Sequence, residues 1–343
     1  MESILFLACV EADGSLAKAA REALSAAKNL AAGLGGAPLV VGLIGAEVQS
    51  AANALAACGA ARFLGVAGAE FAPSRYTTDT AAATALAKAA GATIVVAPAS
   101  SRTNRCLAGA AQRLGGRVDS HATSIAAAAD GKISLTRWYY RQRMEGVLTR
   151  TARPWVVLLE SGCAPAYAGV PGTTTVEAVA VELPALRTTV TGVRAPASDA
   201  QTIRPDAKLL FVAGAGWTKK QADGQVHATE AEQLILGFLA SAKASLGSTK
   251  SLVDLSGEGQ AVLKFMSHLN QVGQTGSTPR HPKGLATCCH GEEPHTVGWR
   301  FINERRAINL NAACSWAQGK ADVLYVADAF DVMRKVNALL SSG

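Results

Sequence analysis

The sequence is poor in aromatic and charged residues. Aromatic side chains make up 5% of the 343 residues and charged side chains 17%, whereas 49% of the residues are hydrophobic. No apolar run approaches the roughly 18 residues that a membrane-spanning helix needs. The first residues include Glu2 instead of a basic segment, and the apolar run 4–10 is too short for a secretion signal. We therefore expect a cytoplasmic protein with a substantial core.

Regularly spaced cysteines and long basic blocks are also missing. The seven cysteines are odd in number and scattered, which indicates buried thiols and not a disulfide framework. The net charge is +7, but no Lys/Arg block of the kind that binds nucleic acid occurs. The densest basic stretch, 137–153, alternates with aromatic residues. It predicts either a solvated pair of strands or a docking surface for an acidic partner or a phosphate.

Strands and helices alternate in the first half of the chain, which predicts a parallel sheet with right-handed crossovers. After residue 132 the pattern changes to short strands without long helices, so an antiparallel extension should close this domain. The expected strands are 4–10, 38–44, 62–66, 93–97, 133–140, 146–150, 156–160 and 175–181, and the expected helices are 15–34, 46–57, 77–90 and 104–114.

A second alternation follows a segment rich in proline, serine and threonine. The boundaries predict an N-terminal α/β domain at 1–183, a linker at 184–207 and a second domain at 208–343. The fold class is therefore α/β, with two doubly wound parallel-sheet domains of which the C-terminal one is smaller. In that domain we expect strands at 209–213, 251–254, 307–310 and 322–326, and helices at 229–246, 261–269 and 329–340.

The most informative motif is the loop Gln-Val-Gly-Gln-Thr-Gly at 271–276. Two glycines bracket an amide and a hydroxyl, a composition that suits either a plain turn or a loop laid against a flat, hydrogen-bonding ligand. Together with the upstream loop 247–250, it resembles the flavin-binding signature of the electron transfer flavoprotein alpha subunit. The strands 4–8 and 95–99 are similar to that family's first domain.

The resemblance implies a fold, a cofactor and partners. The C-terminal domain would hold most of one FAD, and an electron transfer flavoprotein beta subunit would complete the site in a heterodimer. The protein would be an electron carrier and not an enzyme with a substrate of its own. It would accept electrons from a dehydrogenase and pass them to a membrane or iron-sulfur redox partner.

The resemblance also assigns cofactor-binding positions. Thr249 keeps the family's hydroxyl, and Lys250 takes the place of an arginine above the flavin ring, where a cation raises the flavin potential. Gly216 stands where the family has an arginine that contacts the diphosphate, with Lys219 and Lys220 close by. The remaining positions in the glycine loop are Gln271, Val272, Gly273, Gln274 and Thr275, with the Thr275 hydroxyl presented to the flavin N5.

The segment 288–295 supports two interpretations. Cys288, Cys289, His290 and His295 could ligate a metal, although adjacent cysteines rarely bind one zinc together. The family alignment instead assigns His290, Gly291, Glu292 and His295 to the flavin site, with His295 near the flavin O2 and with acids at 292 and 293 that the family lacks.

Asn309 and Asp328 complete the site in the resemblance, both near the adenosine part of FAD. The departures at Gly216, Lys250 and Glu292 leave an alternative open, in which the chain is a degenerate, flavin-free interaction subunit of a dehydrogenase complex. No hydrolase, Walker A or EF-hand motif is present.

Overall fold

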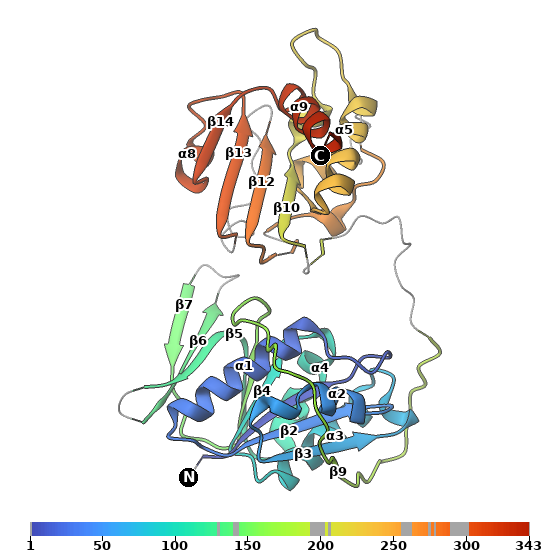
Figure 1. Cartoon of the computed structure of the whole chain (residues 1–343), viewed down its shortest axis with the longest axis vertical. Helices are drawn as coiled ribbons and strands as arrows, with labels where there is room; N and C mark the ends of the chain where they lie inside the picture. Colours follow the sequence, from blue (N-terminus) through green and yellow to red (C-terminus); the bar gives the residue numbers. More distant parts are fainter. Residues whose placement is uncertain are drawn as a thin grey trace. The chain divides into compact units, whose positions relative to one another are not determined.

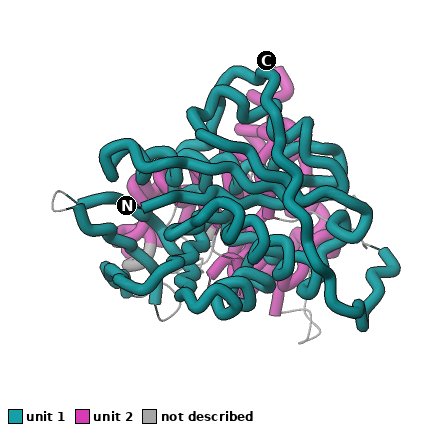
Figure 2. Tube along the Cα trace, turned by 90° about the horizontal axis from the view of Figure 1, so that it is seen from below, with its two compact units in different colours: residues 1–194 teal, residues 195–343 magenta. Residues whose placement is uncertain are grey.

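The computed structural model divides the chain into two compact units, residues 1–194 and 195–343 (Figure 2). It describes residues 2–128, 131–139, 144–192, 203–204, 207–254, 263–273, 276–277, 279–288 and 302–342. Both units are α/β, and unit 2 is built on an all-parallel sheet, so the predicted fold class is confirmed (Figure 1).

Unit 1 contains a nine-stranded sheet with helices on both faces. Its strand order is β7-β6-β5-β8-β4-β1-β2-β3-β9, parallel except for the antiparallel pairs β5–β6 and β6–β7. The strands are β1 (Ile4–Cys9), β2 (Leu39–Gly45), β3 (Arg62–Ala67), β4 (Ile94–Pro98), β5 (Arg117–Ala127), β6 (Ile133–Tyr139), β7 (Met144–Leu148), β8 (Trp155–Leu159) and β9 (Glu177–Ala178). The helices are α1 (Lys18–Gly33), α2 (Gln49–Ala54), α3 (Tyr76–Ala89) and α4 (Ser101–Arg113).

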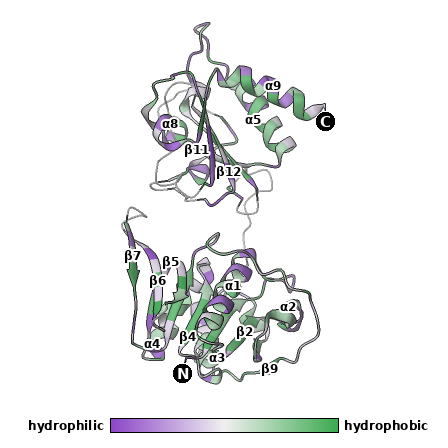
Figure 3. Ribbon diagram, turned by 60° about the vertical axis from the view of Figure 1, so that its left-hand side comes forward, coloured by the Kyte–Doolittle hydropathy of each residue, from purple (hydrophilic) through white to green (hydrophobic). Residues whose placement is uncertain are grey.

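The core of unit 1 forms because its central strands are apolar on both faces, as the run of hydrophobic residues in these strands shows (Figure 3). Side chains of one face pack beneath α1 and α2, and those of the other beneath α3 and α4. The sequence prediction missed β5, which is eleven residues long and the longest strand of the sheet. Polar residues such as Asp119 and His121 interrupt its apolar pattern, so the sequence gives no clear strand signal there.

Asp119 on β5 is the buried charge that holds the antiparallel extension. Its carboxylate accepts hydrogen bonds from Arg137 on β6 at 3.0 Å, from Arg150 before β8, and from the Trp155 indole at 2.8 Å. Arg153 in turn pairs with Glu2 at 2.6 Å. These three arginines of the basic stretch 137–153 are therefore committed to internal ion pairs, which supports the strand-pair interpretation over the docking surface. Arg141 and Arg143 lie outside the described residues.

Unit 2 contains a five-stranded parallel sheet in the order β11-β10-β12-β13-β14. Its strands are β10 (Leu209–Ala213), β11 (Ser245–Ser248), β12 (Lys283–Cys288), β13 (Glu304–Asn309) and β14 (Val323–Val326). The helices are α5 (Ala228–Ala242), the short α6 (Lys250–Asp254), α8 (Ser315–Lys320) and α9 (Ala329–Ser341), with 3₁₀ turns at Ala215–Thr218 and His268–Asn270.

Helices α5 and α9 pack together on one face of this sheet, and α8 covers part of the other (Figure 1). One predicted strand was misplaced here and another strand was missed. The strand lies at 245–248 and not at 251–254, which is helix α6, and β12 was not predicted. The described part of the predicted helix 261–269 begins without helix and ends in the 3₁₀ turn.

We expect Asp119→Asn to destabilise unit 1 by about 3 kcal/mol, because it removes the charge of the buried carboxylate that the partly buried Arg137 and Arg150 share. Chemical denaturation combined with amide exchange of β5 peptides measures this loss. Glu145→Gln on the exposed strand β7 is the matched control and should change stability by less than about 0.5 kcal/mol.

The pH dependence of this loss follows from the pKa of Asp119. Burial raises that pKa, but hydrogen bonds from Arg150 and Trp155 and the charge of the arginines outweigh burial and hold it below its ordinary value of 3.8. The stabilisation is therefore present above that value and is lost as the pH falls through the lower pKa of the folded state. A stability difference between variant and wild type that persists unchanged at pH 2 would contradict this assignment.

Candidate functional site

One edge of the unit 2 sheet gathers most of the predicted site residues that the structure describes. In a parallel sheet all strands end at the same edge, and ligands of open α/β sheets bind there. Gly216 follows β10, Thr249 and Lys250 follow β11, Asn309 ends β13 and Asp328 follows β14. The chain leaves β10 toward β11 on one side and returns to β12 on the other, so the strand order reverses between β10 and β12.

The glycine loop is attached to this edge through β11. Val272 N donates to Ser248 O at 3.0 Å, and the Val272 side chain is fully buried against β10. Gly273 has φ +87°, a conformation that disfavours other residues. A Cβ on Gly276 would lie 2.1 Å from Gln271 O. The two glycines are therefore required by the turn itself, which places a close-packed backbone beside the strand end.

Asn309 carries a buried polar atom without a partner. Its side chain is 0% exposed, and its Oδ1 accepts a hydrogen bond from Asn311 N at 2.8 Å. Its Nδ2 has no hydrogen-bond partner among the described residues, nor has the buried Ser248 Oγ at the end of β11. Unpartnered buried polar groups cost roughly 1–3 kcal/mol each. Two of them at one strand edge fit a site whose ligand supplies the missing partners.

Thr249 and Lys250 already have partners in the chain. Thr249 is 1% exposed, its N–H donates to Ala213 O at 2.9 Å, and its Oγ1 accepts from Leu252 N at 3.3 Å. The hydroxyl therefore caps α6. The Lys250 ammonium is about half exposed and pairs with Asp254. The hydrogen bonds from Lys250 and then His268 lower the pKa of Asp254.

Trp217 was missed in the sequence analysis and dominates the turn after β10. It is 0% exposed, its indole N–H donates to Thr287 Oγ1 at 2.8 Å, and its ring lies 4.6 Å from that of Phe330. The neighbouring Gly216 is buried, and its carbonyl accepts from Gln221 Nε2 at 3.0 Å. Gly216 supplies no side chain for a diphosphate, and Lys219 and Lys220 are exposed on the following segment.

Asp328 is the N-cap of α9 and accepts hydrogen bonds from Phe330 N at 2.8 Å and Asp331 N at 3.2 Å. It also lines a cavity of about 250 Å³ together with Gln221, His227, Phe330 and Arg334. A cavity of this size is smaller than typical sites for drug-sized ligands, so it holds at most part of a dinucleotide. Gln221 and His227 carry no sequence signal that distinguishes them from surface residues.

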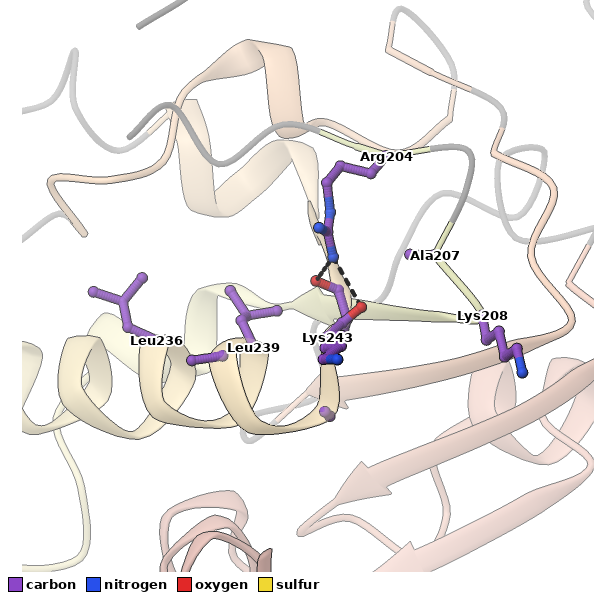
Figure 4. Close-up of a pocket in the computed structure, with 9 residues that line it drawn as sticks. Arg204, Ala207, Lys208, Leu236, Leu239 and Lys243 are labelled. Atoms are coloured by element: carbon purple, nitrogen blue, oxygen red, sulfur yellow. Dashed lines mark hydrogen bonds between the residues drawn. The ribbon is translucent and has the colours of Figure 1, made fainter. Parts of the chain in front are cut away.

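A separate cavity of about 650 Å³ lies at the opposite edge, beside the start of β10 and the end of α5 (Figure 4). Arg204, Lys208 and Lys243 supply its charges, and Leu236 and Leu239 part of its apolar wall. The Arg204 guanidinium donates to the carbonyls of Lys243 at 2.8 Å and Ala244 at 3.1 Å. Arg204 therefore caps the carboxyl end of α5, which is a structural role.

Six of the predicted positions lie outside the described residues: Gln274, Thr275, His290, Gly291, Glu292 and His295. The same holds for most of the alternative metal ligands in the segment 288–295. In the part of the chain that the structure describes, no group of three or more His, Cys, Asp or Glu residues could hold a metal ion.

A comparison of the sequence with models of protein families shows to which family the chain belongs. The model of the electron transfer flavoprotein domain matches residues 4–186, which is more than half of the chain. The chain belongs to the electron transfer flavoprotein domain family. No curated protein matches the chain significantly. Across the described residues, no helix combines the length and the apolar character needed to cross a membrane.

Gly276 provides a direct test of the site geometry. Gly276→Ala should destabilise the turn by roughly 1–3 kcal/mol, because the new methyl group collides with the Gln271 carbonyl. Amide exchange at Val272, whose N–H bonds to β11, should accelerate by at least tenfold. Gly319→Ala in α8, where a Cβ meets nothing within 4 Å, is the control and should leave exchange at Val272 unchanged. Equal exchange rates at Val272 in both variants would refute the claim that the turn requires Gly276.

Proposed function

We propose that the protein is the alpha subunit of a heterodimeric electron transfer flavoprotein and carries FAD at the carboxyl edge of the unit 2 sheet. The family match supports an electron-transfer role for the chain. The observation that carries the site is the unpartnered Asn309 Nδ2, buried at the edge where the residues of the flavin signature meet. Its surroundings are those of a ligand-binding edge.

The described residues offer an FAD three kinds of contact: a backbone position without a side chain, hydrogen-bonding groups and a positive charge. Gly273 has no side chain of its own, so it places no Cβ between its backbone and a flat ring. Asn309 offers an amide donor and Ser248 a hydroxyl, both already desolvated. The partly exposed Lys250 ammonium supplies positive charge at the end of β11. When bound, FAD supplies the ability to accept and release one or two electrons.

The protein then has no organic substrate of its own. A beta subunit completes the cofactor site, an electron-donating dehydrogenase reduces it, and a second redox partner reoxidises it. We propose a cytoplasmic location. This chain contributes the cofactor's position and the charge around it, which together set the potential at which it exchanges electrons.

A second candidate is a flavin-free interaction subunit of a dehydrogenase complex. Specific contacts favour it: the Thr249 hydroxyl caps α6, Lys250 is paired with Asp254, and Gly216 has no side chain to meet a diphosphate. In this case the carboxyl edge of the unit 2 sheet would keep the arrangement of a binding site without binding FAD. The two candidates differ in one measurable property, the presence of bound flavin.

Co-expression with a beta subunit of the same family distinguishes the candidates. The purified complex should show flavin absorbance and release about one FAD per heterodimer on denaturation, identified by mass. The chain expressed alone should be poor in flavin, because the part of the site that the beta subunit supplies is missing. A heterodimer that stays free of flavin after reconstitution with excess FAD would support the interaction subunit. A stable monomer that binds one FAD would contradict a site shared with the beta subunit.

Asn309→Ala should weaken FAD binding roughly 2–10-fold, which corresponds to the loss of one hydrogen bond of about 0.5–1.5 kcal/mol. Isothermal titration of the flavin-free heterodimer with FAD measures the change. Asn337→Ala is the matched control, since Asn337 also has a buried unpaired atom but lies on α9 and donates to Leu234 O. Unchanged affinity in Asn309→Ala, or an equal loss in both variants, would remove Asn309 from the site.

A further inference from the structure

The cavity at the amino edge of the unit 2 sheet combines an apolar wall with cationic side chains. Its volume of about 650 Å³ lies within the range of small-molecule sites. Alanine and leucine supply six of its nine lining residues, and Arg204, Lys208 and Lys243 supply the other three. None of the described residues that line it is acidic. This composition suits a ligand that has both an apolar and an anionic part.

The three cations of the cavity are not neutralised by acidic residues in the described part of the chain. Lys208 and Lys243 are exposed and form no ion pair there. The Arg204 guanidinium donates only through Nη2, to the neutral carbonyls of Lys243 and Ala244. The carboxyl end of α5 offsets the equivalent of roughly half a charge. The cavity therefore keeps an excess of positive charge.

Lys243 carries its side chain at a backbone position that favours glycine. It is the C-cap of α5 and has the left-handed conformation, with φ +50°. A side chain at such a position strains the backbone, and helices usually end in glycine there. The helix end does not depend on the Lys243 side chain, because Arg204 already donates to the carbonyls at this end. A lysine at a strained position beside a cavity indicates a role for its ammonium.

The apolar and the cationic parts of the lining are separated along the cavity. Figure 4 shows Leu236 and Leu239 on α5 at one end, Lys208 at the start of β10 at the other, and Arg204 and Lys243 between them. Leu236 is 37% exposed, whereas Leu239 is 4% exposed and belongs to the core. The lining therefore suits an elongated ligand with one apolar end and one charged end.

We propose that this cavity binds an organic anion with an aliphatic body. The body lies against Leu236 and Leu239, and the anionic head group lies near Lys208 and Lys243. Carboxylates and phosphate monoesters share this chemistry. The cavity lies at the edge of the sheet opposite to the candidate flavin site, so the proposal does not depend on whether the chain carries FAD.

Isothermal titration of the flavin-free full chain with four probes tests the class of ligand. Octanoate and octyl phosphate carry both parts of the expected ligand, and the tighter binder identifies the head group. Octanol lacks the charge and acetate lacks the aliphatic body, so each should bind at least about fivefold more weakly. Octanol or acetate binding as tightly as the octyl anions, or failure of both octyl anions to bind, overturns the proposal.

Variants of the two lysines test the position of the head group. Lys208→Gln and Lys243→Gly should each weaken the binding of octanoate about two- to fivefold, which is the contribution of one exposed ion pair. Lys335→Gln is the matched control, since it removes an exposed lysine on α9 that does not line the cavity. Unchanged affinity in both cavity variants, or an equal loss in the control, refutes recognition by these lysines.

Lys243→Gly also separates binding from folding. Glycine fits the left-handed position, so this variant without ligand should unfold at a higher temperature than the wild type although it binds octanoate less tightly. A lower unfolding temperature would contradict the strain at Lys243 on which the proposal partly rests. Leu236→Ala tests the apolar wall and should weaken the binding of octanoate but not that of acetate. Wild-type affinity for octanoate in Leu236→Ala overturns the placement of the aliphatic body.

Discussion

The parallel pairing of β10 to β14 is the constraint on which the candidate site depends. Each strand contributes only four to six residues, but parallel alignment brings all their carboxyl ends to one edge. Residues separated by more than a hundred positions in the chain, from Gly216 to Asp328, reach that edge for this reason alone. Short-range hydrogen bonds hold the residues there: the Trp217 indole to Thr287, the Thr249 hydroxyl to Leu252 N, and the backbone of Val272 to that of Ser248.

Burial and charge are divided differently in the two units. In unit 1 Arg137 and Arg150 of the antiparallel extension pair with the buried Asp119. Part of a stretch that looks like a basic surface in the sequence therefore forms internal ion pairs. In unit 2 the charged groups near the candidate site lie at its rim: Lys250 and Asp254 on α6, and Arg334 beside Asp328. Rim charges change a nearby cofactor's electrostatic surroundings at little cost in stability.

Much of the fold could be predicted because its core strands are continuous apolar runs. The failures have physical causes. β11 reads Ser-Leu-Gly-Ser, and its glycine is there because a Cβ would lie 2.7 Å from Val272 Cγ2, a tertiary contact that sequence does not reveal. β12 follows a proline-containing segment and begins with lysine, and β5 mixes polar residues with apolar ones. Tertiary pairing determined these strands, and local propensity did not.

The sequence predicted positions of the candidate site and not its contacts. The cofactor-binding roles of Gly273 and Asn309 stay predictions. The ion pair of Lys250 with Asp254 spans i to i+4 and could be foreseen only if 250–254 had been predicted as helix. The tilted ring contact of Trp217 with Phe330 joins elements more than a hundred residues apart and has no signature in the sequence.

Hydrogen exchange of the reconstituted heterodimer, with and without FAD, tests the central claim most directly. The account predicts protection in peptides at the carboxyl edge of the unit 2 sheet, covering 245–254, 268–273 and 307–312. It predicts no protection at the amino edge around Arg204, Lys208 and Lys243. Protection confined to that amino edge or to unit 1 would contradict the account.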